Sequence, residues 1–193
     1  MSSRHHTARR AAPVLLACGV VALGFAAYVI IDAREYQSVE RTRFEATTPS
    51  AVTAPVPTDG ASIGEIQIPR LGLRAMIAQG ESAPTLRRSV GHLSDTALPG
   101  EVGNVVLAGH RDTFFRPLSG VRAGDSIALK TWDGEFEYVV ESTSVVAPGA
   151  VEVLEPTGGR TLTLITCYPF SYIGTAPNRF IVRARQRIEA LSE

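Results

Sequence analysis

The chain has 193 residues, of which 45% are apolar and 20% are charged, and its 19 basic side chains equal its 19 acidic ones in number. This composition excludes a disordered tail, a collagen-like repeat and a membrane protein with many spans. A net charge of zero gives no bulk field that would recruit nucleic acid, and we expect none as a partner. The two cysteines, Cys18 and Cys167, are too few and lie in surroundings too different for a disulfide framework or a cysteine-rich zinc site.

Residues 13–31 form an apolar segment near the N-terminus. They carry no charged side chain and are long enough, at the rise of an α-helix, to cross the hydrocarbon core of a bilayer. The preceding flank, residues 1–12, contains Arg4, Arg9 and Arg10 and no acidic residue, so we predict that the flank stays cytoplasmic and that the rest of the chain is exported. The segment ends in Tyr-Val-Ile-Ile rather than in a small-residue cleavage site, which favours an uncleaved, single-pass anchor over a signal peptide.

The next stretch, residues 32–62, has the composition of a spacer. Residues 32–45 carry alternating charges that can continue the helix briefly, and the residues after them are rich in Pro, Thr, Ser and Ala, which cannot form a core. We expect this stretch to hold an extracytoplasmic domain, residues 63–193, away from the bilayer.

Residues 63–193 have the pattern of an all-β domain. Short β-like runs alternate with Gly, Pro or Asp at intervals of about 8 to 12 residues, and no stretch shows helix-length apolar periodicity. This pattern predicts a β-barrel or a β-sandwich. Short helical turns are expected at 84–90 and 113–118. The predicted strands are residues 64–68, 74–78, 104–110, 126–131, 135–146, 161–167 and 179–187. Along the strand at 135–146, Phe136, Tyr138 and Val140 alternate with Glu135, Glu137 and Val139, which predicts one buried face.

Cys167 is a candidate nucleophile. It closes the apolar strand predicted at 161–167 and precedes a Tyr-Pro pair, which places its thiol at a strand end beside a loop. A free cysteine is most often a small, buried apolar side chain. An unpaired thiol in an exported domain is unusual, however, and a thiolate stabilised by an imidazole or a guanidinium is a strong nucleophile. A histidine or an arginine should therefore lie near a catalytic Cys167.

His110 and Arg179 are the candidates for that role. His110 ends the strand predicted at 104–110 and opens a loop, whereas His92 lies in a Gly-flanked turn, so strand-end geometry favours His110. Arg179 begins the last predicted strand, which would pair with the cysteine strand and bring guanidinium and thiol to one end. A guanidinium there can hold a substrate carbonyl or the oxyanion of a tetrahedral intermediate. Judged from the residues alone, each of the two is also compatible with a structural or surface role.

Three segments resemble the histidine, cysteine and arginine motifs of the sortase family: LAGHRDTFF, TLITCYPF and APNRFIV. The similarity is greatest to class D, extends over essentially all of residues 63–193 and includes the specific Thr-Leu-x-Thr-Cys signature. The N-terminal anchor and spacer are also as in that family. The resemblance implies a closed eight-stranded β-barrel with one or two short helices and a substrate-facing loop at 144–159, between the sixth and seventh strands.

The resemblance also implies an activity and a set of site residues. The enzyme would be a cysteine transpeptidase that cleaves a sorting signal of the Leu-Pro-x-Thr-Gly type after Thr. Cys167 matches the nucleophile that forms a thioester, His110 the acid and base toward the two amines, and Arg179 the residue that orients substrate and stabilises the oxyanion. Thr166 matches a signature threonine, which we expect to shape the substrate-binding part of the site. The implied partners are secreted proteins with a C-terminal sorting signal and an amine acceptor from a cell-wall precursor or a pilin.

No cofactor or metal is expected. Glu152 and Glu155 in the expected substrate-facing loop suggest a calcium site as in some sortases, but two loop carboxylates are more often solvated. Two other functions stay open: a thiol protease that passes the same thioester to water, and a membrane-anchored β-barrel binding module with a structural cysteine. The occurrence of the three motifs in the expected order favours the transpeptidase.

Overall fold

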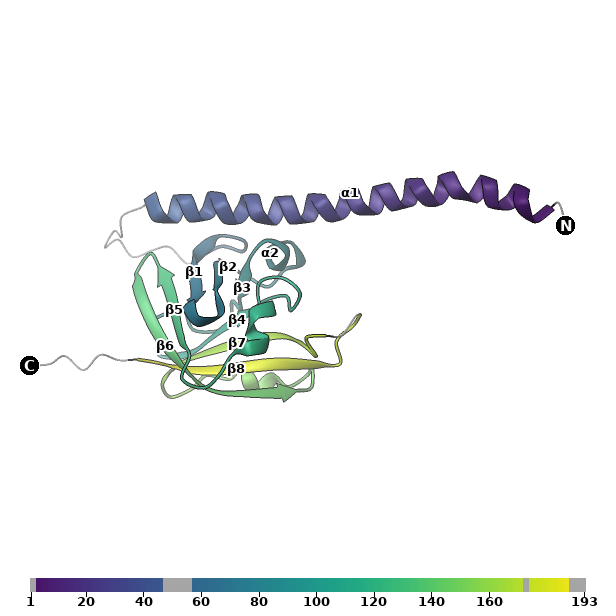
Figure 1. Ribbon diagram of the computed structural model, residues 1–193. Coiled ribbons are helices and arrows are strands. Elements are labelled where there is room, and N and C mark those ends of the chain that lie inside the picture. Colours follow the sequence, from purple (N-terminus) through teal and green to yellow (C-terminus); the bar gives the residue numbers. More distant parts are fainter. Residues whose placement is uncertain (1–2, 47–56, 172–173, 188–193) are drawn as a thin grey trace, which may run out of the picture.

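One long helix and a β-barrel make up the protein (Figure 1), and the computed structural model describes residues 3–46, 57–171 and 174–187. The helices are α1 (Ser3–Ala46) and α2 (Ala83–Arg88), and the short 3-10 turns are η1 (Pro69–Leu71), η2 (Arg116–Gly120) and η3 (Val151–Val153). The strands are β1 (Ser62–Ile68), β2 (Leu73–Gln79), β3 (Val90–His92), β4 (Gly103–Ala108), β5 (Ser126–Thr131), β6 (Gly134–Val146), β7 (Arg160–Tyr168) and β8 (Asn178–Gln186).

The strands close into a barrel in the order β1-β2-β3-β4-β7-β8-β6-β5, which confirms the expected eight-stranded fold. The β2–β3 and β4–β7 pairs are parallel, and the other pairs are antiparallel. The β4–β7 pair is the important one for function. Because parallel strands run in the same direction, the residues that follow β4 and those that end β7 lie at the same end of the barrel.

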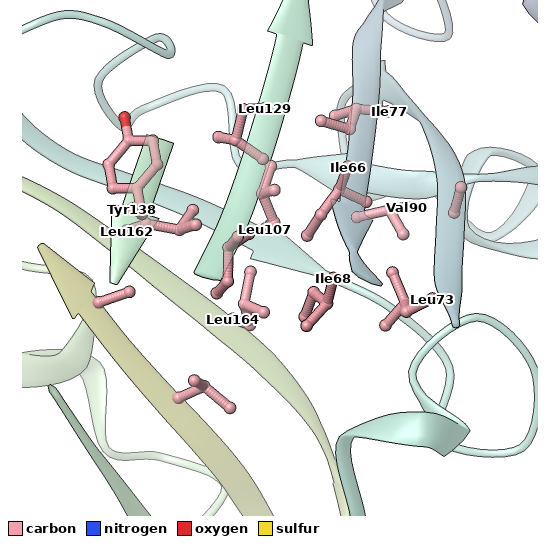
Figure 2. Packing of buried hydrophobic residues seen from close by; sticks show 14 of the residues in the cluster. Ile66, Ile68, Leu73, Ile77, Val90, Leu107, Leu129, Tyr138, Leu162 and Leu164 are labelled. Atoms are coloured by element: carbon pink, nitrogen blue, oxygen red, sulfur yellow. The ribbon is translucent and has the colours of Figure 1, made fainter. Parts of the chain in front are cut away.

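Aliphatic side chains fill the interior of the barrel (Figure 2). Leu162 and Leu164 of β7 are fully buried, and Tyr138 of β6 is the largest of the fully buried side chains. On β6, Tyr138 and Val140 face the core while Glu137 is exposed, as the alternation in the sequence predicted. Removal of this apolar surface from water is the main force that holds the strands together.

Strand β3 was not predicted, and the turn expected around His92 is wrong. Three residues are too few to show the alternation that marks a strand. Pairing on both sides holds β3 in place, parallel to β2 and antiparallel to β4. The helical turn expected at 84–90 is α2, which ends at Arg88 because Val90 already belongs to β3. The turn expected at 113–118 lies slightly later in the chain, as η2.

Helix α1 continues well beyond the apolar segment, through residues 32–46 of the expected spacer. This second half lies alongside the barrel, while the apolar half projects past it (Figure 1). Asp32 forms an ion pair with Arg88 of α2, with Nε and Oδ2 2.7 Å apart. Farther along the helix, Phe44 packs on Trp132 with ring centroids 4.6 Å apart. The docked half of α1 is therefore part of the folded unit; residues 47–56 of the expected spacer lie outside the described residues.

A buried carboxylate, that of Glu65 in β1, joins α1 to the barrel. This side chain is 1% exposed and accepts hydrogen bonds from Arg41 of α1, Arg74 of β2 and Gln67, at 2.9, 2.7 and 2.7 Å. Burial by itself would raise the pKa of the carboxyl, but the hydrogen bonds from these three donors lower the pKa overall. Because a buried charge left without its partners is strongly destabilising, Glu65 holds Arg41, and with it the helix, against the barrel.

Candidate active site

Neighbouring strands β4, β7 and β8 end or begin at one end of the barrel, and a residue selected from the sequence lies on β7, on β8 and just after β4. In the β7–β8 register, Cys167 lies directly opposite Arg179. In the β4–β7 register, Ala108 lies opposite Ile165. The ladder extends one step further because the backbone N–H of Gly109 donates to the Ile165 carbonyl at 3.1 Å.

This register brings His110 to the level of Cys167. His110 is two residues beyond Ala108, and Cys167 is two residues beyond the partner of Ala108 in β7. Adjacent strands are about 4.8 Å apart. His110, which follows β4 by two residues, thus lies at the same end of the barrel as the paired Cys167 and Arg179, and we call these three residues the row, with Cys167 on the middle strand. The structure thus brings together the three residues that were far apart in the sequence.

The three side chains of this row differ in exposure and in polar contacts. Cys167 is a half-buried free thiol, and His110 is exposed. Arg179 is half-buried, and its Nη1 donates to the carbonyls of Asn178 and Ala176 at 3.0 and 3.4 Å. In the part of the chain that the structure describes, no carboxylate pairs with Arg179. Several of its five N–H donors are thus free to bind a ligand next to the thiol.

Thr166 links β7 to the loop that carries the histidine. Its side chain is 2% exposed, and its hydroxyl donates to the carbonyl of Gly109 at 2.7 Å, one residue before His110. The hydroxyl that we expected to shape the substrate-binding part of the site is thus bonded to the backbone of the histidine loop. Its hydrogen bond reinforces the β4–β7 ladder at the point where the row begins.

Arg111 is a site residue that the sequence analysis missed. Its side chain is only 6% exposed, and Nη1 donates to the carbonyl of Pro169 at 2.8 Å. Nη2 forms an ion pair with the neighbouring Asp112 at 3.2 Å. The residue after His110 is thereby tied to the loop that follows Cys167. Its place in the LAGHRDTFF motif was the available signal, but burial of a guanidinium is not visible in a local pattern.

An apolar pocket of about 280 Å³ adjoins the cysteine and arginine strands. Ile165 and Ile181, which are paired across β7 and β8, line it, and each is two residues from Cys167 or Arg179 on its own strand. Arg179 also lines the pocket. The connection between β6 and β7, where the substrate-facing loop was expected, contributes Ala147, Pro148, Ala150, Val151, Val153 and Leu154. The pocket therefore extends from the row along the outer face of the sheet.

His92, the histidine that the sequence analysis set aside, is a buried group of the barrel. It is 1% exposed, its Nε2 donates to the Ala97 carbonyl at 2.9 Å, and its Nδ1 forms a 2.9 Å hydrogen bond with the side-chain amide of Gln79. Burial lowers the pKa of His92. The ring is thus neutral in the folded protein at neutral pH and is far from solvent.

We expect the buried His92 to make the barrel less stable in mild acid. Its pKa in the folded state is below the usual value of 6.5, so the unfolded chain binds more protons once the pH falls below that value. The contribution of neutral His92 to the free energy of unfolding is complete above about pH 7. It decreases as the pH falls from about 6.5 toward the pKa of His92 in the folded protein. Urea unfolding at pH 7 and pH 5 measures the loss. His92→Gln should lose less stability between the two pH values; an equal loss would contradict the prediction.

Proteins of known family resemble this chain over the whole barrel. The sortase-domain family model matches residues 66–187, from within β1 to just after β8. The chain belongs to the sortase family. It is similar to Sortase D of Bacillus subtilis (strain 168), with 30% identity over 188 residues that cover 89% of this chain and 95% of that protein.

Solved structures agree with this assignment. This sortase is similar to a Clostridium perfringens Sortase D5 transpeptidase, with a TM-score of 0.68, 26% identity and coverage of 81% of this chain and 98% of that one. It is also similar to sortase E from Streptomyces avermitilis, with a TM-score of 0.58, 33% identity and coverage of 68% and 91%. The resemblance to class D is confirmed. As a sortase the protein is a cysteine transpeptidase, which excludes the non-catalytic binding module.

Proposed function

We propose that this sortase cleaves a sorting signal of the Leu-Pro-x-Thr-Gly type after Thr and joins the new carboxyl end to an amine. The row of His110, Cys167 and Arg179 carries the proposal. A thiol between an imidazole and a guanidinium has what amide exchange needs: a nucleophile, a proton donor and acceptor, and a cation for the oxyanion.

In the first half of the reaction, the thiolate of Cys167 attacks the carbonyl carbon of the signal threonine. The carbonyl oxygen becomes an oxyanion, and N–H donors of Arg179 stabilise it. The protonated imidazole of His110 gives its proton to the leaving amine as the C–N bond breaks. The products are the free amine of the C-terminal fragment and a thioester on Cys167.

In the second half, an incoming amine attacks the thioester carbonyl. His110, now neutral, accepts a proton from this amine, and the C–S bond breaks to release the thiolate of Cys167. A new amide forms, and the enzyme returns to its starting state. If water attacks instead, the product is a carboxylate, which is the outcome for a thiol protease.

The apolar pocket beside Arg179 supports a signal that begins with Leu-Pro. In such a signal the leucine and proline precede the threonine whose carbonyl is attacked. Two or three extended residues span roughly 7 to 10 Å. Ile165 and Ile181 in the pocket wall are each two strand residues from Cys167 or Arg179, which is a similar distance. Apolar side chains of the signal gain free energy by leaving water there.

We also propose that α1 is a single-pass anchor whose N-terminus is cytoplasmic. Helix residues Pro13–Ala46 include an 18-residue window with a mean hydropathy of 2.6, none of which is buried in the protein. The flank at 1–12 is basic and has no acidic residue, which favours retention in the cytoplasm. The barrel would then meet secreted proteins with a C-terminal sorting signal, and the amines of cell-wall precursors or pilins, outside the membrane.

Mass spectrometry of the full chain in detergent micelles tests the proposed reaction. The protein is incubated with a library of Leu-Pro-x-Thr-x peptides and with triglycine as the amine. We expect an acyl adduct on the proteolytic fragment that contains Cys167, and a triglycine-capped product from the preferred peptide. Hydrolysed peptide without capture at any amine concentration would indicate the thiol protease. Absence of both adduct and product with every peptide would contradict the proposed substrate class.

A further inference from the structure

A groove of about 520 Å³ lies between α1 and the barrel, at the point where the apolar segment of α1 ends. One wall begins with Val29 and Ile30, the last part of the apolar segment, and continues along the docked half of the helix. The facing wall includes Arg87 of α2 and Phe114 of the loop between β4 and η2. The groove thus opens where the proposed membrane span gives way to the folded unit.

The lining of this groove is basic. Four arginines face it, Arg34, Arg41, Arg74 and Arg87, and none of its described lining residues is acidic. Arg41 and Arg74 are already bonded to Glu65. Arg34 and Arg87 are exposed, and neither has an ion pair or side-chain hydrogen bond within residues 3–46, 57–171 and 174–187. Two positive charges therefore face the groove without a counter-charge.

In the proposed membrane orientation, Arg34 lies at the depth of the lipid phosphates, and Arg87 lines the same groove. Arg34 is three residues after the end of the apolar segment, a rise of about 4.5 Å along a helix. Basic side chains just outside the hydrocarbon core meet the headgroup layer of the bilayer. Val29 and Ile30, one turn earlier, would contact the first methylenes of the acyl chains.

We propose that the groove binds the phosphodiester headgroup of an anionic membrane lipid, with Arg34 and Arg87 as its ligands. A guanidinium binds phosphate oxygens through paired N–H donors, so hydrogen-bond geometry and positive charge both contribute to the affinity for phosphate. The two unpaired cations favour an anionic lipid over a zwitterionic one, and the apolar wall favours a lipid over a free phosphate ion. This proposal rests on the proposed membrane anchoring of α1.

A lipid in the groove also fixes how the catalytic end faces the membrane. Thr113 and Phe114, which line the groove, follow His110 in the same loop. The end of β7 and the start of β8 lie at the end of the barrel toward which the apolar half of α1 projects (Figure 1). The lipid would therefore hold the active end of the barrel toward the bilayer surface.

Native mass spectrometry of the full chain, released from detergent micelles, tests the lipid site. Phosphatidylglycerol is titrated as the anionic lipid and phosphatidylcholine as the zwitterionic one. We expect a retained phosphatidylglycerol adduct whose apparent affinity falls roughly tenfold or more in Arg34→Gln/Arg87→Gln. The matched control is Arg183→Gln/Arg185→Gln in β8, which removes the same charge on the side of the barrel away from α1 (Figure 1) and should bind as the wild type does.

The proposal would be overturned by equal phosphatidylglycerol binding by the groove variant, by an equal loss in the β8 control, or by equal affinity of the wild type for the two lipids. Soluble glycerol phosphate tests the source of the phosphate, and binding as tight as that of the lipid would also overturn it. Because lipid binding is read from mass without turnover, it can be measured in Cys167→Ala. A failure of the lipid site is then distinct from a failure of the proposed transpeptidation.

Discussion

Replacing Cys167 with alanine is expected to abolish transpeptidation and to leave the barrel folded. The thioester requires the sulfur, and the described part of the barrel contains no second thiol. Loss of a covalent nucleophile lowers turnover by roughly 10⁵-fold or more. Cys167 is half-buried at the end of β7, so alanine fills most of its volume. The rate of triglycine-capped product from the preferred peptide measures the effect, and thermal unfolding measures the stability.

The other cysteine provides the matched control for this experiment. Cys18 is an exposed free thiol in the apolar half of α1 and is not part of the barrel. Cys18→Ala should cap the peptide at the wild-type rate. A Cys167→Ala protein that keeps substantial activity, or a Cys18→Ala protein that loses it, would show that the sulfur of Cys167 is not the nucleophile.

Replacing His110 with alanine is expected to slow transpeptidation by roughly 10²- to 10⁴-fold, the usual effect of losing a general acid and base. The leaving amine would depart unprotonated, and the incoming amine would keep its proton. Because His110 is exposed, its removal leaves a space that solutes can enter. Added imidazole should therefore restore part of the rate. Single-turnover formation of the acyl adduct, with and without imidazole, measures both effects.

Comparison with a variant of the buried His92 distinguishes a chemical role of His110 from a structural one. His92→Gln removes a ring that is bonded inside the barrel, so it should lower the free energy of unfolding but keep the rate at temperatures where the variant is folded. His110→Ala should show the opposite pattern, with a lost rate and little change in stability. If both variants lose rate in proportion to their loss of stability, His110 acts through the fold and not as an acid and base.

Local patterns in the sequence were sufficient to find the residues of the row and most of the strands. Alternation along β6 predicted which face is buried, because a strand exposes its two faces in turn whatever its neighbours are. Turn residues and a Tyr-Pro pair placed Cys167 at a strand end. The three motifs predicted the family, and the family resemblance predicted the closed barrel. Motifs and their order can be recognised in the sequence without knowledge of the fold.

Contacts between residues far apart in the sequence determined the features that local patterns did not predict. Strand β3 is held by pairing with β2 and β4 on its two sides. Arg111 becomes a site residue through a hydrogen bond to Pro169, 58 residues later. Helix α1 extends through half of the expected spacer because its polar side chains find partners on the barrel, such as Glu65 for Arg41. Burial and pairing of this kind depend on which elements become neighbours, and a single stretch of sequence does not contain that information.

The row shows most clearly what local sequence patterns and tertiary contacts each contribute. Local sequence patterns already place His110, Cys167 and Arg179 where a strand meets a loop. The adjacency of the strands in the order β4-β7-β8, with Cys167 on the middle strand, arises only in the folded chain. Barrel closure is its cause, because it pairs β4 with a parallel strand more than 50 residues away and so brings the three strand ends together.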